Sequence, residues 1–172
     1  MELWNIYDKE RVKIDKTIKR GDEFPENEFH LVVHICIFNS DGEMLIQQRQ
    51  PFKEGWTNMW DITVGGSAVV GETSSKAAER ELFEEIGYRA DLSGERPFFT
   101  INFRTGFDDY YLIEKNVDIS KLKLQYEEVQ NVKWSGKEEI LKMIDDSSFI
   151  PYYSSLIGML FEMRNHRGAD RV

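Results

Sequence analysis

The sequence predicts a mixed α/β fold, because several strand-like segments occur along the chain together with about three helix-like ones. The clearest strand signal is a hairpin over residues 30–50, where HLVVHICIF and EMLIQQRQ flank the turn sequence NSDG. The clearest helix signal lies just before Gly87, which is placed to end a helix that Thr73, Ser74 or Ser75 can cap.

The other expected strands follow from the same kind of local signal. Near the N-terminus, LWNIYD and KIDK predict a short hairpin, and the charged loop RGDEFPENEF follows it. After the aromatic-rich loop PFKEGWTNMW, the segment WDITV predicts a short strand that runs into Gly65 and Gly66. RPFFTINFRT and DDYYLIEKNV predict two strands joined at TGF, and VQNVKW predicts one more.

Two further helices are expected near the C-terminus. The segment SGKE at Ser135–Glu138 has the capping-box pattern and opens KEEILKMIDD. The segment IPYYSSLIGMLFEMRN begins with Pro151, which suits the first turn of a helix. Its apolar residues recur at helical spacing, which predicts a contact with the core or with another subunit. These residues are Tyr153, Leu156, Ile157, Leu160 and Met163.

Length and composition indicate one globular domain over residues 1–172, with residues 1–28 as a hairpin and loop extension. The net charge of -9 argues against a broad grip on a nucleic-acid polymer, which needs clustered Lys and Arg. Cys36 is the only cysteine, so an internal disulfide and a cysteine-based zinc site are excluded. The sequence has no signal-peptide pattern and no apolar run that approaches a membrane span, so we expect a cytoplasmic protein without a membrane partner.

The helix before Gly87 gathers acidic residues on one face. At about 100° per residue, Glu81, Glu84 and Glu85 fall within a quarter to a third of a turn, beside an apolar face. Like charges at this spacing repel by a few tenths of a kcal/mol per pair. A solvated acidic face is one interpretation. The other is a site for a divalent cation such as Mg²⁺ or Mn²⁺, which prefers carboxylate, carbonyl and water oxygens.

The sequence around these acids favours the metal site. The segment GGSAVVGETSSKAAERELFEEIGY satisfies G-x5-E-x7-R-E-U-x-E-E-x-G-U, where U is a bulky apolar or aromatic residue, and it closely resembles the signature of the Nudix hydrolase family. The matching residues are Gly66, Glu72, Arg80, Glu81, Leu82, Glu84, Glu85, Gly87 and Tyr88. Tyr88 is a mild departure, since an aliphatic residue is more usual there.

The resemblance implies an α/β/α sandwich with a mixed sheet, in which this Nudix box forms a loop-helix-loop. It implies hydrolysis of a diphosphate linkage in a nucleoside diphosphate derivative or related organic diphosphate, with Mg²⁺ or Mn²⁺ as cofactor. Glu81, Glu84 and Glu85 would ligate the metal, with the Gly66 carbonyl as a further ligand. Glu72 and Arg80 would orient that cluster through charge-assisted hydrogen bonds.

The general base differs between members of the family, so several acids are candidates here. Glu84 is favoured, and the alternatives are Glu81 and the later loop acids Glu127 and Glu128. The chemistry needs metal ions to neutralise the phosphate oxygens and to lower the pKa of bound water. A nearby glutamate can then accept the proton.

The expected partner is a small-molecule diphosphate. Arg49 and Lys53 can pair with its phosphates, and Trp56 can stack on a base. For each of these residues, strand packing or a solvated charge is an equally good interpretation. A homodimer is common in the family, and the last helix has an apolar stripe that could contribute to one.

Residues 3–134 also resemble type 1 isopentenyl-diphosphate isomerase and the hydrolases related to it. In the isomerase a catalytic cysteine follows the sequence WTN, whereas Asp61 stands about there in this chain. Cys36 lies inside the strand HICIF, where a small buried hydrophobe is expected. The missing thiol and the complete Nudix box favour hydrolysis. The alternatives are an isomerase-like activity and a non-catalytic module that senses a nucleotide.

The resemblance to the isomerase also bears on histidines and further acids as metal ligands. His30 matches a metal-binding histidine of the isomerase, but Lys19 stands at the position of its partner. We therefore expect His30 and His34 to be ordinary strand residues. Asp108 and Asp109 fall near additional acidic ligands of the isomerase, and a role in a turn is about as good an interpretation.

Overall fold

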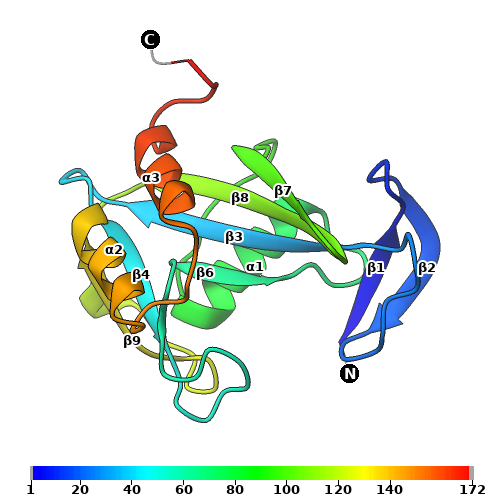
Figure 1. The fold of residues 1–172 in the computed structure, drawn as a ribbon, viewed down its shortest axis with the longest axis horizontal. Helices are drawn as coiled ribbons and strands as arrows, with labels where there is room; N and C mark the ends of the chain where they lie inside the picture. Colours follow the sequence, from blue (N-terminus) through cyan, green and yellow to red (C-terminus); the bar gives the residue numbers. More distant parts are fainter. Residues whose placement is uncertain (1, 171–172) are drawn as a thin grey trace.

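The computed structural model describes residues 2–170, which form a mixed sheet between helices and a separate N-terminal hairpin (Figure 1). The elements are β1 (Leu3–Tyr7), β2 (Lys13–Lys19), β3 (His30–Phe38), β4 (Met44–Arg49), β5 (Trp60–Asp61), β6 (Val64–Ser67), α1 (Ser74–Ile86), β7 (Phe99–Phe103), β8 (Gly106–Glu114), a 3-10 turn (Ile119–Lys121), β9 (Val129–Ser135), α2 (Lys137–Asp145) and α3 (Ser154–Met163).

The main sheet has the strand order β5-β4-β3-β8-β7, with β6 also paired to β3 and β9 also paired to β4. Strands β3 and β8 run parallel along their whole length, from His30 opposite Gly106 to Phe38 opposite Glu114. The other pairs are antiparallel, so the sheet is mixed as the sequence predicts. Strand β3 is therefore central to the molecule.

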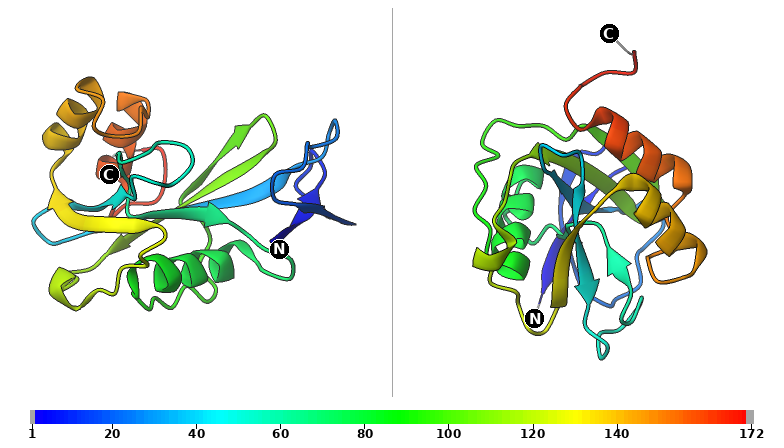
Figure 2. Two further views of the ribbon diagram at one scale, coloured as in Figure 1. Left: turned by 90° about the horizontal axis from the view of Figure 1, so that it is seen from below. Right: turned by 90° about the vertical axis from the view of Figure 1, so that its left-hand side faces the viewer.

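The side chains of β3 alternate between two cores, as expected of a strand covered on both faces. One core holds Val33, Ile35 and Ile37 together with the apolar face of α1. The other holds Cys36 and Phe38 together with residues of α2 and α3. Figure 2 shows α1 on one side of the sheet and α2 and α3 on the other. The fold is thus the predicted α/β/α sandwich, and its continuous apolar strand is explained by burial on both sides.

The sheet forks along one edge of β3. Residues 32–35 pair with β6, whereas β4 pairs with β3 only where Phe38 lies opposite Met44. Between these two pairings, the Thr63 hydroxyl accepts a hydrogen bond from the Ile37 amide at 2.9 Å and donates one to the Leu45 carbonyl. One side chain thus replaces a backbone pair at the fork. The predicted strand WDITV is consequently two strands, β5 and β6, separated by Ile62 and Thr63.

The N-terminal hairpin packs against the body of the protein at one end of β3 (Figure 1). Trp4 forms a bridge with Val69, and the Val70 amide donates to the Leu3 carbonyl at 2.9 Å. Tyr7 forms a second bridge with Phe29. The hairpin is therefore tied both to the loop that precedes α1 and to the residue that precedes β3.

Helix α2 begins at Lys137 as predicted, but its predicted cap and the predicted start of α3 were wrong. The N-cap of α2 is Gly136 instead of Ser135, because Ser135 still pairs with Met44 in the sheet and its hydroxyl donates to Glu139 at 2.9 Å. Helix α3 begins at Ser154, so Pro151 lies before the helix instead of in its first turn.

The apolar stripe of α3 is otherwise as predicted, with one exception. Ile157 and Leu160 are fully buried, and Leu156 and Met163 pack against the same core, whereas Tyr153 is 83% exposed. The stripe thus serves the core of this chain. The longest helix in residues 2–170 has 13 residues, and none there is long and apolar enough to cross a membrane.

Candidate active site

Helix α1 has the boundaries that its sequence predicts, and they fix the orientation of its acidic face. The Thr73 hydroxyl accepts a hydrogen bond from the Lys76 amide at 3.3 Å, and Gly87 ends the helix with φ 69°. Ala78, Leu82 and Ile86 are fully buried against the sheet. The three carboxylates beside this apolar face are therefore held in place by core packing.

The three carboxylates differ in their exposure to solvent. The side chain of Glu84 is half exposed, whereas that of Glu81 is only 12% exposed. Glu85 is buried, and its carboxylate accepts a hydrogen bond from Gln47 Nε2 on β4 at 2.9 Å. A uniformly solvated acidic face is therefore excluded, because such a face would leave all three carboxylates in water.

Arg80 joins these carboxylates to the loop before the helix. Its Nε and Nη2 donate to the two oxygens of Glu72 at 2.7 and 3.0 Å, and Nη2 also donates to the Ser67 carbonyl at 3.1 Å. Its Nη1 lies 2.9 Å from both Glu81 Oε1 and Glu84 Oε2. A bidentate pair of this kind fixes the guanidinium more firmly than a single contact would.

Burial makes two of the acids reluctant to ionise. It raises the pKa of Glu81 to about 7, with a further upward contribution from the Glu84 charge that Arg80 opposes. It raises the pKa of Glu85 to about 8, against the lowering effect of the hydrogen bond from Gln47. A cation bound between these groups would favour their charged forms.

The residues present fit a hard divalent cation. Glu81, Glu84 and Glu85 offer oxygen ligands, and the buried Gln47 Oε1 beside Glu85 has no hydrogen-bond partner within residues 2–170. A Cβ at Gly66 would overlap the carboxylate of Glu81, so a larger residue there would displace that group from its present position. Within the described chain no three acidic, histidine or cysteine side chains converge on one point, because Arg80 lies between two of these carboxylates.

A cavity of about 540 Å³ opens above this cluster. Among the described residues, five carboxylates and three cationic side chains line it, so an anionic ligand needs additional positive charge there. The lining residues are Glu2, Trp4, Arg20, Lys53, Gly65, Gly66, Ser67, Val69, Arg80, Glu81, Glu84, Glu85, Gln125 and Glu128. The three from the N-terminal hairpin were not predicted from the sequence.

Of the three expected substrate-binding residues, only Lys53 lines the cavity. Lys53 lines the cavity and pairs with Glu128, which also lines it. Arg49 and Trp56 are not among the lining residues: Arg49 donates to the Glu54 and Gly55 carbonyls, and Trp56 is 52% exposed with a positive φ of 49°. Glu127 does not line the cavity either, whereas Glu128 does.

The residues compared with the isomerase occupy the second core and the sheet. Cys36 is fully buried, and burial raises the pKa of its thiol, which is the behaviour of a packing residue. Asp61 is buried and accepts a hydrogen bond from the Tyr152 hydroxyl at 2.8 Å. His30 and His34 are both in β3, as expected.

Asp108 and Asp109 do not form a turn, because both lie within β8. Asp108 contacts His34 at 3.2 Å. Asp109 is fully buried and pairs with Arg11 of the N-terminal hairpin loop. It also accepts hydrogen bonds from the hydroxyls of Ser74 and Thr100, at 2.5 and 2.6 Å. Asp109 therefore links the hairpin, the start of α1 and β7.

Comparisons with known proteins identify the family of this chain. Residues 28–153 match the NUDIX domain model. A Nudix hydrolase of Listeria innocua is 47% identical over 165 residues, which cover 96% of each chain. An isopentenyl-diphosphate Delta-isomerase of Pectobacterium atrosepticum is 32% identical over 92 residues, which cover 54% of this chain and 50% of that protein.

Solved structures extend the likeness to the fold. The crystal structure of DR0079 from Deinococcus radiodurans has a TM-score of 0.72 at 21% identity, and the match covers 94% of this chain and 98% of that one. The family model spans most of the chain, and the Listeria hydrolase aligns along nearly its whole length. The chain therefore belongs to the Nudix family and is a hydrolase.

Proposed function

We propose that this protein uses a divalent metal ion, Mg²⁺ or Mn²⁺, to hydrolyse a diphosphate linkage in a nucleoside diphosphate derivative or a related organic diphosphate. The observation that carries the proposal is the position of Glu81, Glu84 and Glu85 on one face of α1, opening into a cavity with a surplus of carboxylates. A diphosphate is itself anionic, so it requires cations to enter such a site.

In this proposal Glu81, Glu84 and Glu85 hold the metal, and the Gly66 carbonyl is a further ligand. A metal ion held by these residues would supply charge neutralisation at the phosphates and a lower pKa for a coordinated water. Arg80 keeps Glu81 and Glu84 in position from one side, while Glu72 fixes Arg80 through its two hydrogen bonds. Loss of Glu72 would therefore act on the metal ligands indirectly.

Glu84 is the general base that we favour. Its side chain is the most exposed of the three carboxylates, so it can contact a water molecule in the cavity. One of the Glu84 oxygens, Oε2, contacts Arg80 Nη1 at 2.9 Å, which orients the carboxylate. Glu81 and Glu128 are the alternatives that also line the cavity.

A substrate panel tests the proposal. Purified protein with Mg²⁺ or Mn²⁺ is incubated with nucleoside diphosphate sugars, ADP-ribose, dinucleoside polyphosphates and isopentenyl diphosphate, and released phosphate and nucleotide are measured. We expect turnover of at least one compound that depends on added metal. If no compound is hydrolysed under conditions where a known Nudix enzyme is active, the proposed function is wrong.

A matched pair of variants separates metal binding from folding. Glu85→Gln removes the charge of one proposed ligand, whereas Glu79→Gln makes the same change on the same helix at a residue that accepts a hydrogen bond from the Leu92 amide. We expect Glu85→Gln alone to weaken Mn²⁺ binding in calorimetry and to lose turnover. Equal behaviour of the two variants would contradict the ligand assignment.

An isomerase-like activity is the second candidate, and the likeness to the Pectobacterium isomerase over half of the chain motivates it. Incubation with isopentenyl diphosphate distinguishes the two reactions. Formation of dimethylallyl diphosphate would indicate isomerisation, and release of phosphate would indicate hydrolysis. Binding of panel compounds without turnover, unaffected by Glu84→Gln, would instead indicate a nucleotide-sensing module.

A further inference from the structure

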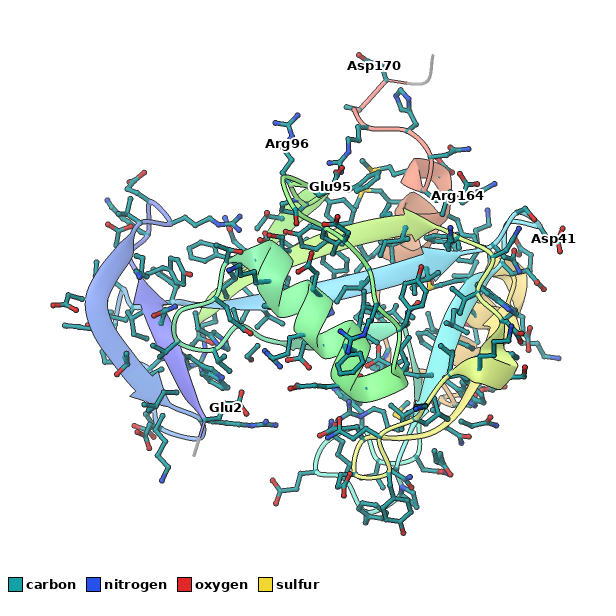
Figure 3. All side chains as sticks on the ribbon, turned by 180° about the vertical axis from the view of Figure 1, so that it is seen from behind. Glu2, Asp41, Glu95, Arg96, Arg164 and Asp170 are labelled. Carbon is teal, nitrogen blue, oxygen red and sulfur yellow. The ribbon has the colours of Figure 1, made fainter. Side chains whose placement is uncertain are left out.

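The wall of the active-site cavity includes a segment outside the matched family domain. The NUDIX match begins at residue 28, yet Glu2, Trp4 and Arg20 line the same cavity as the carboxylates of α1. Figure 3 labels Glu2 at the N-terminal end of the hairpin, and Figure 2 shows this end beside the loop that leads to α1. The hairpin is therefore placed to contact whatever binds there.

The hairpin is fixed in this position by contacts at both of its ends. At the open end, the Trp4 bridge to Val69 holds β1 beside the loop that follows Gly66. At the closed end, Arg11 pairs with the buried Asp109. An isolated two-stranded hairpin is only marginally stable in water. These tertiary contacts therefore fix the position of this cavity wall.

Arg20 has the most exposed side chain of the cavity cations that the structure describes. Among the cationic side chains that the structure describes in the cavity, Arg80 contacts three carboxylates, and Lys53 pairs with Glu128. The side chain of Arg20 is 61% exposed, and its Nη1 donates to Glu2 Oε2 at 2.9 Å. Its backbone amide also donates to the Glu2 carbonyl at 3.1 Å, which anchors the main chain while the guanidinium reaches the solvent of the cavity.

The partner of Arg20 has a second hydrogen bond of its own. Glu2 Oε1 accepts from Trp4 Nε1 at 2.7 Å. If the guanidinium turns to an incoming phosphate, Glu2 keeps this donor and is not left unpaired. Exchange of the Glu2 carboxylate for a phosphate at Arg20 therefore costs little free energy, because the paired N–H donors of a guanidinium match the oxygens of both anions.

We propose that Arg20 binds a phosphate oxygen of the substrate diphosphate from the hairpin side of the cavity, and that it determines affinity for the substrate without taking part in the chemical step. This inference rests on the proposed function, because it assumes that a diphosphate occupies the cavity. The N-terminal hairpin then contributes a substrate-binding residue to the active site, and Glu2 competes with the substrate for Arg20.

Binding of non-hydrolysable diphosphates tests this assignment directly. The probes are α,β-methylene-ADP and methylenediphosphonate, titrated into the full chain with Mg²⁺ in a calorimeter. Loss of a charge-assisted hydrogen bond should weaken binding of at least one probe roughly 10-fold to 100-fold in Arg20→Ala. Arg20→Lys should recover part of that loss, because it restores the charge without the fork.

Two further variants distinguish a phosphate contact from a structural ion pair. Lys19→Ala removes a neighbouring exposed charge of β2 that does not line the cavity, and it should bind the probes like the wild type. Glu2→Gln removes the competing anion and should bind them at least as tightly as the wild type. If Glu2→Gln weakens binding as much as Arg20→Ala does, the pair is structural and the inference is wrong.

Kinetics give an independent check and separate this inference from the proposed function. On any substrate that the wild type hydrolyses, Arg20→Ala should raise KM about 10-fold or more and change kcat less than about 3-fold. An unchanged KM, or a loss confined to kcat, would overturn the assignment, as would failure of the wild type to bind either probe. Absence of turnover in the wild type with normal probe binding would count against the proposed function alone.

Discussion

Replacement of His30 by Phe is expected to remove a specific part of the pH dependence of stability. His30 is 7% exposed, its ring lies 4.5 Å from that of Trp4 and 4.7 Å from that of Phe24, and its Nδ1 has no hydrogen-bond partner in the described part of the chain. Burial lowers the pKa of His30 from 6.5 to about 4, which the nearby Asp108 opposes. The folded protein therefore contains neutral His30.

The sign and the size of the effect follow from this shift. A histidine whose pKa is lowered by folding contributes stability that is complete above its unfolded pKa and is lost as the pH falls toward its folded pKa. Between pH 8 and pH 5.5, linkage gives a loss of about 1.4 kcal/mol for the shift to about 4, as an upper value. In His30→Phe this loss should be absent.

Urea denaturation of the metal-free protein at pH 8 and pH 5.5 measures the effect. The quantity to compare is the change in unfolding free energy between the two pH values, in the wild type and in His30→Phe. The raised pKa values of Glu81 and Glu85 act in the opposite direction over the same range, since acids of this kind stabilise the fold as the pH falls. They are common to both proteins and cancel. Equal pH dependence in both would refute a neutral, buried His30.

Three other substitutions have defined outcomes. Glu85→Gln should raise the thermal midpoint of the metal-free protein, because it removes a buried ionisable group, while turnover falls about 100-fold or more; differential scanning fluorimetry with EDTA and an activity assay measure both. Gly66→Ala should displace the flexible Glu81 carboxylate and weaken Mn²⁺ binding about 10-fold in calorimetry, with little loss of stability. Arg11→Ala should cost about 1–2 kcal/mol in urea denaturation, because Asp109 loses its cationic partner but keeps two hydroxyl donors.

Matched controls accompany these variants. Gly158→Ala adds a methyl group into open space on α3 and should bind Mn²⁺ like the wild type. Lys9→Ala removes an exposed hairpin charge and should leave the urea midpoint unchanged. A metal-free Glu85→Gln protein that is less stable than the wild type would show that the charge of Glu85 has a structural role. Normal metal binding in Gly66→Ala would show that Glu81 is not a ligand.

Local sequence signals were sufficient for the elements whose boundaries depend on neighbouring residues. The helix α1 is an example, since Thr73 and Gly87 act within one turn of its ends. The cap of α2 depends instead on a distant strand: Ser135 has the right pattern for a cap but remains paired with Met44, so Gly136 takes that position. Boundaries of the second kind require knowledge of the sheet, which the local pattern does not contain.

In the candidate active site, too, some features depend on neighbouring residues and others on distant ones. The spacing of Glu81, Glu84 and Glu85 predicted a shared helix face, because helical geometry is local. It did not predict the different burial of the three side chains, which depends on Gln47 of β4 and on Arg80. The hairpin residues of the cavity, among them Arg20, lie far from α1 in the sequence and carry no motif. Only the folded chain brings them together.

At the fork beside β3, the shape of a side chain does not predict whether it can replace Thr63. Valine has nearly the same volume as threonine, so it would leave no hole and cause no clash in the core. It would, however, leave the amide of Ile37 and the carbonyl of Leu45 facing each other without a mediator, in a place that water does not reach. Strand β6, which carries Gly66, begins directly after Thr63. A single hydroxyl therefore links β3 to β4 at the point where the two strands separate.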